Sequence, residues 1–75
     1  MTFIIITQEN CTYCDKAKRL IVENKMHSVS YNIRNSKWVK DLLGKASLTT
    51  VPQIWNSQGN YIGGYEELDK YIKNL

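Results

Sequence analysis

The sequence contains little of what three common kinds of small protein require. Only two of its 75 residues are cysteine and only one is histidine, so it is no disulfide-dense scaffold. Structural zinc is bound tetrahedrally, and this chain could complete such a site only by dimerising or by recruiting carboxylates. No apolar run approaches the roughly 20 residues of a membrane span, and the lysines and arginines form no dense run. We therefore expect no bound metal, no membrane contact and no nucleic-acid partner.

The N-terminus also lacks the features of a targeting segment. Met1-Thr2-Phe3 has no basic residue, and the apolar run that follows is too short for a signal peptide. We therefore expect a cytoplasmic protein, in which a cysteine pair is kept reduced and used for turnover. A chain of 75 residues makes one domain, 1–75, near the lower size limit for folding alone. Its net charge of +3 permits a mild preference for anionic small molecules or acidic surfaces.

The hydrophobic pattern predicts four strands and three helices in the order β-α-β-α-β-β-α. Three consecutive isoleucines indicate a central strand over 2–7, buried on both faces. Further strands are expected over 29–33, 53–55 and 61–62, the last two joined by turn residues 56–60. Helices are expected over 12–25, from a cap at 35 or 36 to 46, and over 65–75. Their apolar stripes are Ala17, Leu20 and Ile21, then Trp38, Val39, Leu42, Leu43 and Ala46, then Leu68, Tyr71, Ile72 and Leu75.

The stretch Cys11-Thr12-Tyr13-Cys14 stands between the first predicted strand and the first predicted helix. Positions i and i+3 share a helix face, so the two cysteines can form a disulfide and reopen it. The Cys11 sulfur would meet amide N–H groups without intrahelical partners, which stabilise a thiolate together with the helix dipole. Cys14 lies one turn further in and is more shielded. This asymmetry predicts Cys11 as the attacking nucleophile and Cys14 as the resolving thiol.

The cysteine pair has two less specific interpretations. Free cysteines are often simply packed in a core, and two cysteines can also form a permanent disulfide. A permanent bond across so short a loop removes little chain entropy, so it would stabilise the fold weakly. The C-x-x-C spacing at a strand-to-helix junction favours redox chemistry over both.

Three motifs in this order resemble those of the glutaredoxin family, most of all the small phage-type glutaredoxins. They are Cys11-Thr12-Tyr13-Cys14, Thr50-Val51-Pro52-Gln53 and Gly63-Gly64-Tyr65-Glu66-Glu67-Leu68. The resemblance extends over nearly the whole chain. It implies an α/β, thioredoxin-like fold in which three helices flank a four-stranded mixed sheet. It also implies a monomeric glutathione-dependent thiol–disulfide oxidoreductase with no bound cofactor, and ribonucleotide reductase as a protein substrate.

The same resemblance implies where a substrate binds. A cis bond before Pro52 would place the Val51 backbone beside the sulfurs, where it can pair with an extended peptide. The turn at Gly63-Gly64 would hold the γ-glutamyl carboxylate of glutathione, with a positive φ expected at Gly64. The alternatives are a simple loop proline and a turn that only opens a helix. The implied substrate-binding residues are Gln8, Thr12, Tyr13, Thr50, Val51, Pro52, Gly64, Tyr65, Glu66 and either Lys37 or Lys40.

Two positions depart from the family pattern and leave rival functions open. The family often has a lysine where this chain has Gln8, so less charge meets the glycyl carboxylate of glutathione unless Lys37 or Lys40 compensates. The usual proline after the first cysteine is Thr12. One rival is a redoxin reduced by thioredoxin reductase. The other is a carrier of a [2Fe–2S] cluster, which some glutaredoxins without that proline bridge between two subunits with two glutathiones.

Overall fold

The computed structural model describes the backbone of residues 1–34, 37–45 and 50–75. Over these residues the predicted order of elements is confirmed. The elements are β1 (Thr2–Thr7), α1 (Thr12–Glu23), β2 (His27–Asn32), α2 (Lys37–Lys45), β3 (Gln53–Asn56), β4 (Tyr61–Gly63) and α3 (Tyr65–Lys73). The predicted helix cap at 35 or 36 and the predicted helix end at Ala46 lie outside the described residues. None of the described helices is long and apolar enough to cross a bilayer.

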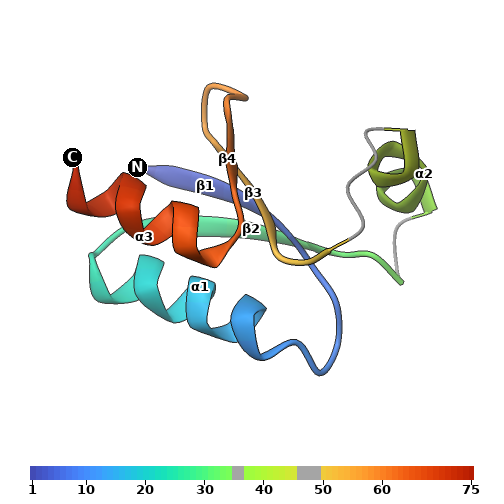
Figure 1. Cartoon of the computed structure of the whole chain (residues 1–75), viewed down its shortest axis with the longest axis horizontal. Coiled ribbons are helices and arrows are strands. Elements are labelled where there is room, and N and C mark those ends of the chain that lie inside the picture. The colour runs from blue at the N-terminus through green and yellow to red at the C-terminus, as the bar shows by residue number, and fades with distance from the viewer. Residues whose placement is uncertain (35–36, 46–49) are drawn as a thin grey trace.

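The four strands form one mixed sheet in the order β2-β1-β3-β4 (Figure 1). The central strand β1 pairs in parallel with β2, with Ile4 opposite Val29. It pairs antiparallel with β3, with Ile6 opposite Gln53. The parallel pair needs a crossover, and α1 supplies it. The predicted thioredoxin-like arrangement of a four-stranded mixed sheet and three helices is confirmed.

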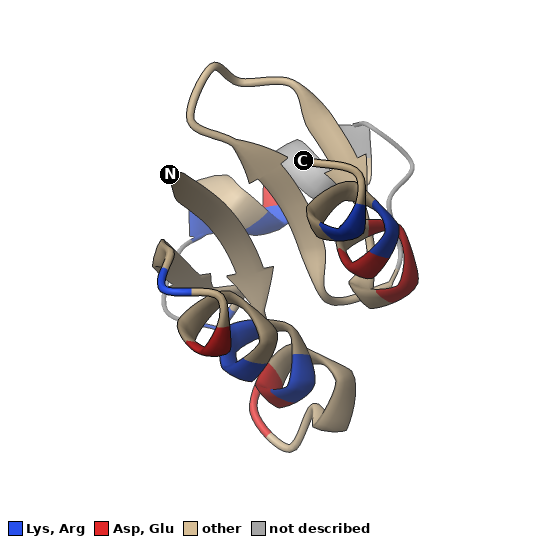
Figure 2. Ribbon diagram, turned by 90° about the vertical axis from the view of Figure 1, so that its left-hand side faces the viewer, with Lys and Arg blue, Asp and Glu red and all other residues tan. Residues whose placement is uncertain are grey.

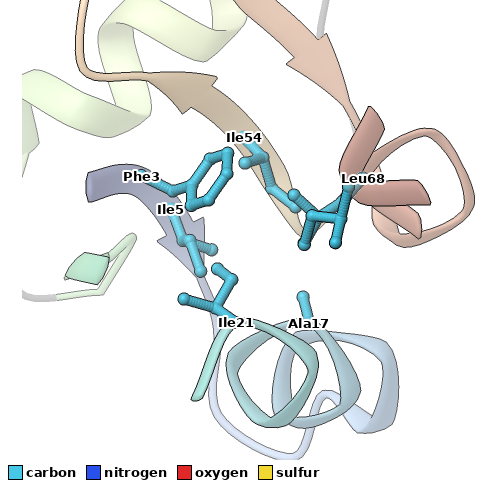
Figure 3. Close-up of a cluster of buried hydrophobic side chains, with 7 residues drawn as sticks. Phe3, Ile5, Ala17, Ile21, Ile54 and Leu68 are labelled. Carbon is cyan, nitrogen blue, oxygen red and sulfur yellow. The ribbon is translucent and has the colours of Figure 1, made fainter. Parts of the chain in front are cut away.

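The main core lies between the sheet and the two helices α1 and α3, which run side by side (Figure 1). Side chains alternate across a strand, so Phe3 and Ile5 of β1 point to the same face. There they meet residues of β3, α1 and α3 in a fully apolar cluster (Figure 3). The members of this cluster are Phe3, Ile5, Ala17, Ile21, Ile54, Leu68 and Ile72. This packing fixes the position of α1, and therefore of the cysteine pair at its start.

The opposite face of the sheet is covered less completely than the sequence predicts. Ile6 is buried there against Val39 of α2, which is 0% exposed. Ile4 is only half-buried, so the prediction that β1 is buried on both faces is wrong at this residue. Trp38 lies on the predicted apolar face of its helix, where it lines a hollow with Ile4 and Ile6, but it is 59% exposed and not part of the core. Successive helical residues lie about 100° apart, so Val39 can face the sheet while Trp38 turns toward the ring of Tyr31.

Two helices are shorter than the predicted spans, and both end at an asparagine. The side-chain amides of Asn24 and Asn74 each donate to the carbonyl four residues back, at 2.8 Å. Lys25 then turns the chain with a φ of 60°, which ends α1 two residues early. Leu75 lies beyond α3 and is 61% exposed, so its assignment to the core stripe is wrong.

Leu68 and Leu75 provide a test of where the core ends. Leu68→Ala removes a side chain that is 0% exposed and should lower the free energy of unfolding by about 2–5 kcal/mol. Leu75→Ala should change it by less than about 0.5 kcal/mol, because its side chain is already largely in water. Urea denaturation of both variants measures the difference. Equal losses would mean that the C-terminal residue packs on the core after all.

Candidate active site

The sheet brings the functional loops to one end of the molecule. The chain leaves β1 at Thr7 on its way to the cysteines, and it enters β3 at Gln53 directly after the proline turn. Antiparallel pairing of Ile6 with Gln53 places these two points side by side. Parallel pairing of Thr7 with Asn32 brings the end of β2 to the same edge. Segments far apart in the sequence therefore meet around the cysteine pair.

Cys11 is the N-cap of α1, as the sequence predicts. Asn10 has a φ of 56°, a conformation that asparagine tolerates, and Cys11 is then extended before the helix begins. The Cys11 sulfur accepts the backbone N–H of Cys14 at 3.1 Å, and the two sulfurs are joined in a disulfide. Cys14 is 1% exposed, whereas Cys11 is partly open to solvent. A reagent in solution therefore reaches the first sulfur more easily than the second.

The proline turn lies against the first sulfur. The Val51–Pro52 peptide bond is cis, as the resemblance implies, and the Val51 carbonyl oxygen lies 3.8 Å from the Cys11 sulfur. Gly64 approaches the same turn from the other side. A Cβ on Gly64 would stand 3.6 Å from the Pro52 carbonyl oxygen. The three motifs that are separate in the sequence are thus in contact in the fold.

A buried amide holds the proline turn in place. The Gln53 side chain is 4% exposed and donates to the Thr50 carbonyl at 2.8 Å and to the Thr50 hydroxyl at 3.1 Å. Its oxygen accepts the hydroxyl of Tyr61. This chain of hydrogen bonds ties β4 to the turn beside the sulfur. In the sequence Gln53 stands out only as the residue directly after the motif proline, and that position is the one signal of its role in holding the turn.

The glycine turn differs from expectation in one respect. The positive φ belongs to Gly63, at 127°, and Gly64 has an ordinary φ of −95°. The prediction of positive φ at Gly64 is therefore wrong, and any Cβ at Gly63 would also collide with Glu67. The Glu67 carboxylate accepts the Gly64 N–H at 3.0 Å, at the i, i+3 spacing of a capping box. The sequence-based prediction did not include this role of Glu67, although the spacing is visible in the sequence.

The remaining predicted residues fall in two places. Tyr13 is 55% exposed, and its ring lies 6.0 Å from that of Tyr65, centroid to centroid. Thr12 and Glu66 are exposed at the first turns of α1 and α3. Gln8, Lys37 and Lys40 share an open groove of about 880 Å³, whose other lining residues are Ile33, Arg34 and Asp41.

Arg34 was not anticipated from the sequence. It follows β2 and forms an ion pair of 3.3 Å with Glu9, which lies in the loop before Cys11. Both side chains are more than half exposed, so the pair contributes little to stability. Arg34 lines the same groove as Gln8 and is a third cation there. Nothing in the local sequence signals this, because the contact spans 25 positions.

A pair of cysteines at a helix N-terminus, set beside a cis-proline turn at one end of a mixed sheet, defines a disulfide oxidoreductase of the thioredoxin-like fold. Comparison with known proteins agrees with this class. The family model described as Glutaredoxin matches residues 3–62, and the chain belongs to the glutaredoxin family. It is 36% identical to the glutaredoxin of Enterobacteria phage T4, over 84% of this chain and 85% of that protein.

Solved structures of relatives have the same architecture. Reduced Escherichia coli glutaredoxin superposes with a TM-score of 0.75 at 29% identity, over 99% of this chain and 95% of the other. Glutaredoxin 1 from Francisella tularensis superposes with a TM-score of 0.77 at 27% identity, over 97% and 93% of the two chains. The chain is thus a disulfide oxidoreductase that spans nearly the full length of these relatives.

The hydrogen bond to the Cys11 sulfur leads to a prediction about the reduced protein. The Cys14 N–H that points at this sulfur favours a thiolate there, so the pKa of Cys11 should lie below the roughly 8.5 of a free thiol. The rate of alkylation by iodoacetamide, measured against pH on a Cys14→Ser variant, reports this ionisation alone. A midpoint at the free-thiol value would contradict the electrostatic argument.

Proposed function

We propose that this protein is a glutathione-linked reductant of protein disulfides, acting as a monomer in a reducing cytoplasm. Cys11 is the nucleophile and Cys14 the resolving thiol. No cofactor is bound, and glutathione is the reductant. Ribonucleotide reductase is the protein substrate that the family resemblance suggests.

The observation that carries the proposal is the cationic groove that contains Gln8, three residues before Cys11. Arg34, Lys37 and Lys40 line it together with the acidic Asp41, and Arg34 is also paired with Glu9. Among these described residues three positive charges therefore meet two negative ones. Glutathione carries two carboxylates and one ammonium group, so a groove with an excess of positive charge favours it. Gln8 stands in the same groove three residues before Cys11, where an amide can donate to a carboxylate.

A small apolar cluster around Ile6 and Val39 links the groove to the turn that lies against the sulfur. Ile33 lines the groove and packs in the same cluster as Val51. The Val51 carbonyl in turn lies 3.8 Å from the Cys11 sulfur. A tripeptide whose cysteine is bonded to Cys11 therefore has the Val51 backbone beside it, and we expect its glycyl end to lie toward the groove. Its γ-glutamyl end would extend toward Gly64, Tyr65 and Glu66 at the start of α3.

The reaction follows from the positions of the two sulfurs. The Cys11 thiolate attacks one sulfur of the substrate disulfide, forms a mixed disulfide and releases the first substrate thiolate. The Cys14 thiolate then attacks the Cys11 sulfur and releases the second. Each released thiolate takes up a proton, so the substrate gains two electrons and two protons while the Cys11–Cys14 bond forms. One glutathione thiolate attacks the Cys11 sulfur, forms glutathionyl-Cys11 and releases the Cys14 thiolate. A second glutathione thiolate attacks the glutathionyl sulfur, so the Cys11 thiolate leaves, glutathione disulfide forms, and the two protons of the glutathione thiols are left for the cysteines.

Coupled turnover tests the proposal and the roles of the two cysteines. The oxidised protein should turn over with glutathione and glutathione reductase, and Cys11→Ser should abolish all activity. Cys14→Ser should lose reduction of protein disulfides but keep reduction of a glutathione mixed disulfide, which needs only one thiol. Consumption of NADPH measures each rate.

A parallel assay with thioredoxin reductase distinguishes the rival reductant. Turnover with that enzyme and none with glutathione would overturn the proposal. An active Cys11→Ser variant beside an inactive Cys14→Ser variant would reverse the assigned roles.

Gln8 provides a test of the groove itself. Gln8→Lys adds a charge near a bound carboxylate and should lower the KM for glutathione by about two- to fivefold, the range expected for one exposed ion pair. The gain should shrink as salt screens the charge. Gln58→Lys makes the same change in the exposed β3–β4 turn, away from the groove, and should leave KM unchanged. Equal effects of the two variants would mean that net charge, not the groove, attracts glutathione.

A further inference from the structure

A second, smaller groove lies between α1 and α3, and its lining shares no residue with the larger groove that contains Gln8. Its volume is about 200 Å³, and it is lined by Lys16, Arg19, Leu20, Glu23 and Tyr65. Pockets for whole small molecules are usually about 300–1,000 Å³. This groove therefore suits one or two side chains of a longer ligand rather than a free small molecule.

The groove is continuous with the surface beside the disulfide. Lys16 lies at its edge and also places its Nζ 5.0 Å from the centre of the Tyr13 ring. Tyr65 lines it as well, and its ring contacts that of Tyr13. Tyr13 itself stands between the two active-site cysteines. A chain bonded to Cys11 can thus run over the tyrosine pair and into the groove.

The charges of the groove favour an anionic occupant. Its lining contains two cations, Lys16 and Arg19, and one carboxylate, that of Glu23. Two acidic residues of α3 already have partners: Glu67 accepts a hydrogen bond from the Gly64 N–H, and Asp69 forms an ion pair with Lys73. Glu66 is exposed in the first turn of α3, outside the groove lining. Figure 2 shows lysine and arginine positions along the middle of α1.

The groove also contains apolar side chains that are held by the core. Leu20 is packed against the main core, and Tyr65 packs there too. Tyrosine and arginine are enriched at protein-recognition sites, because they offer large contact area with polar ends. We propose that the α1–α3 groove docks an acidic segment of the protein substrate whose disulfide Cys11 attacks. The proposal rests on the proposed function and names the class of substrate: proteins with carboxylates next to the reducible disulfide.

Two synthetic peptides test this directly. Each carries one disulfide, flanked on both sides by glutamates in the first peptide and by glutamines in the second. The second-order rate constant for reduction by the reduced protein is measured by acid quench and chromatography of the released thiol. The glutamate peptide should react faster at low salt, and its advantage should vanish near 0.5 M salt, where the Debye length is only about 4 Å.

Neighbouring residues on α1 provide a matched pair of variants. Arg19 lines the groove, whereas Lys18, one residue earlier, points to another side of the helix. Arg19→Glu should slow reduction of the glutamate peptide by about fivefold, the scale of a lost exposed ion pair, and leave the glutamine peptide unchanged. Lys18→Glu makes the same charge change and should affect both peptides by less than twofold. Equal effects of the two variants, or no preference for the glutamate peptide, would overturn the proposal.

A binding measurement separates this proposal from the function on which it rests. A glutamate peptide with serine in place of cysteine cannot react, so its contacts are independent of turnover. It should shift the backbone amide NMR signals of Arg19, Leu20 and Tyr65. Shifts confined to Lys37 and Lys40 would overturn the proposal that the α1–α3 groove is the docking site, even if glutathione turnover is normal. Shifts at Arg19 without glutathione turnover would overturn the proposed function but support the α1–α3 groove as a binding site for acidic peptides.

Discussion

The chemistry of this protein depends on the packing of α1 against the sheet. Ala17 and Ile21 are buried against Phe3 and Ile5 of β1, and this contact fixes where the helix begins. The Cys11 sulfur occupies that beginning and accepts an amide N–H that has no partner within the helix. A loosened core would therefore move the sulfur as well as lower the stability.

The same sheet decides what surrounds the sulfur. Because β1 and β3 are antiparallel neighbours, the end of one strand and the start of the other share an edge. The loop to Cys11 and the turn at Val51 therefore meet, and the buried Gln53 amide holds that turn to Thr50 and Tyr61. The site is thus assembled from short loops whose ends are fixed by paired strands.

The two grooves near the disulfide differ in the side chains that line them. The larger one, on the side of α2, carries Arg34, Lys37 and Lys40 beside Gln8. The smaller one, between α1 and α3, combines Lys16 and Arg19 with the ring of Tyr65. In the proposed function a reductant and a protein substrate react in turn with the same sulfur, and apart from Tyr65, which is assigned to both, each is recognised by different side chains.

Local sequence was sufficient to predict the elements, because apolar periodicity, β-branched runs and turn residues act over a few positions. It also placed the cysteine pair at a helix start, which the structure confirms. Exposure was predicted less well. Trp38 and Leu75 have the right spacing for a core stripe, yet both are mostly in water, because burial depends on what lies opposite.

What the sequence by itself determined is the type of each element and the position of the reactive pair within them. Tertiary structure alone decided the partners: the ion pair of Glu9 with Arg34, the hydrogen bonds of Gln53, and the contact of Tyr13 with Tyr65. It also decided that Gly63, not Gly64, takes the positive φ. The physical reason is that secondary structure follows from interactions between near neighbours, whereas a site is made where strand pairing brings distant residues together.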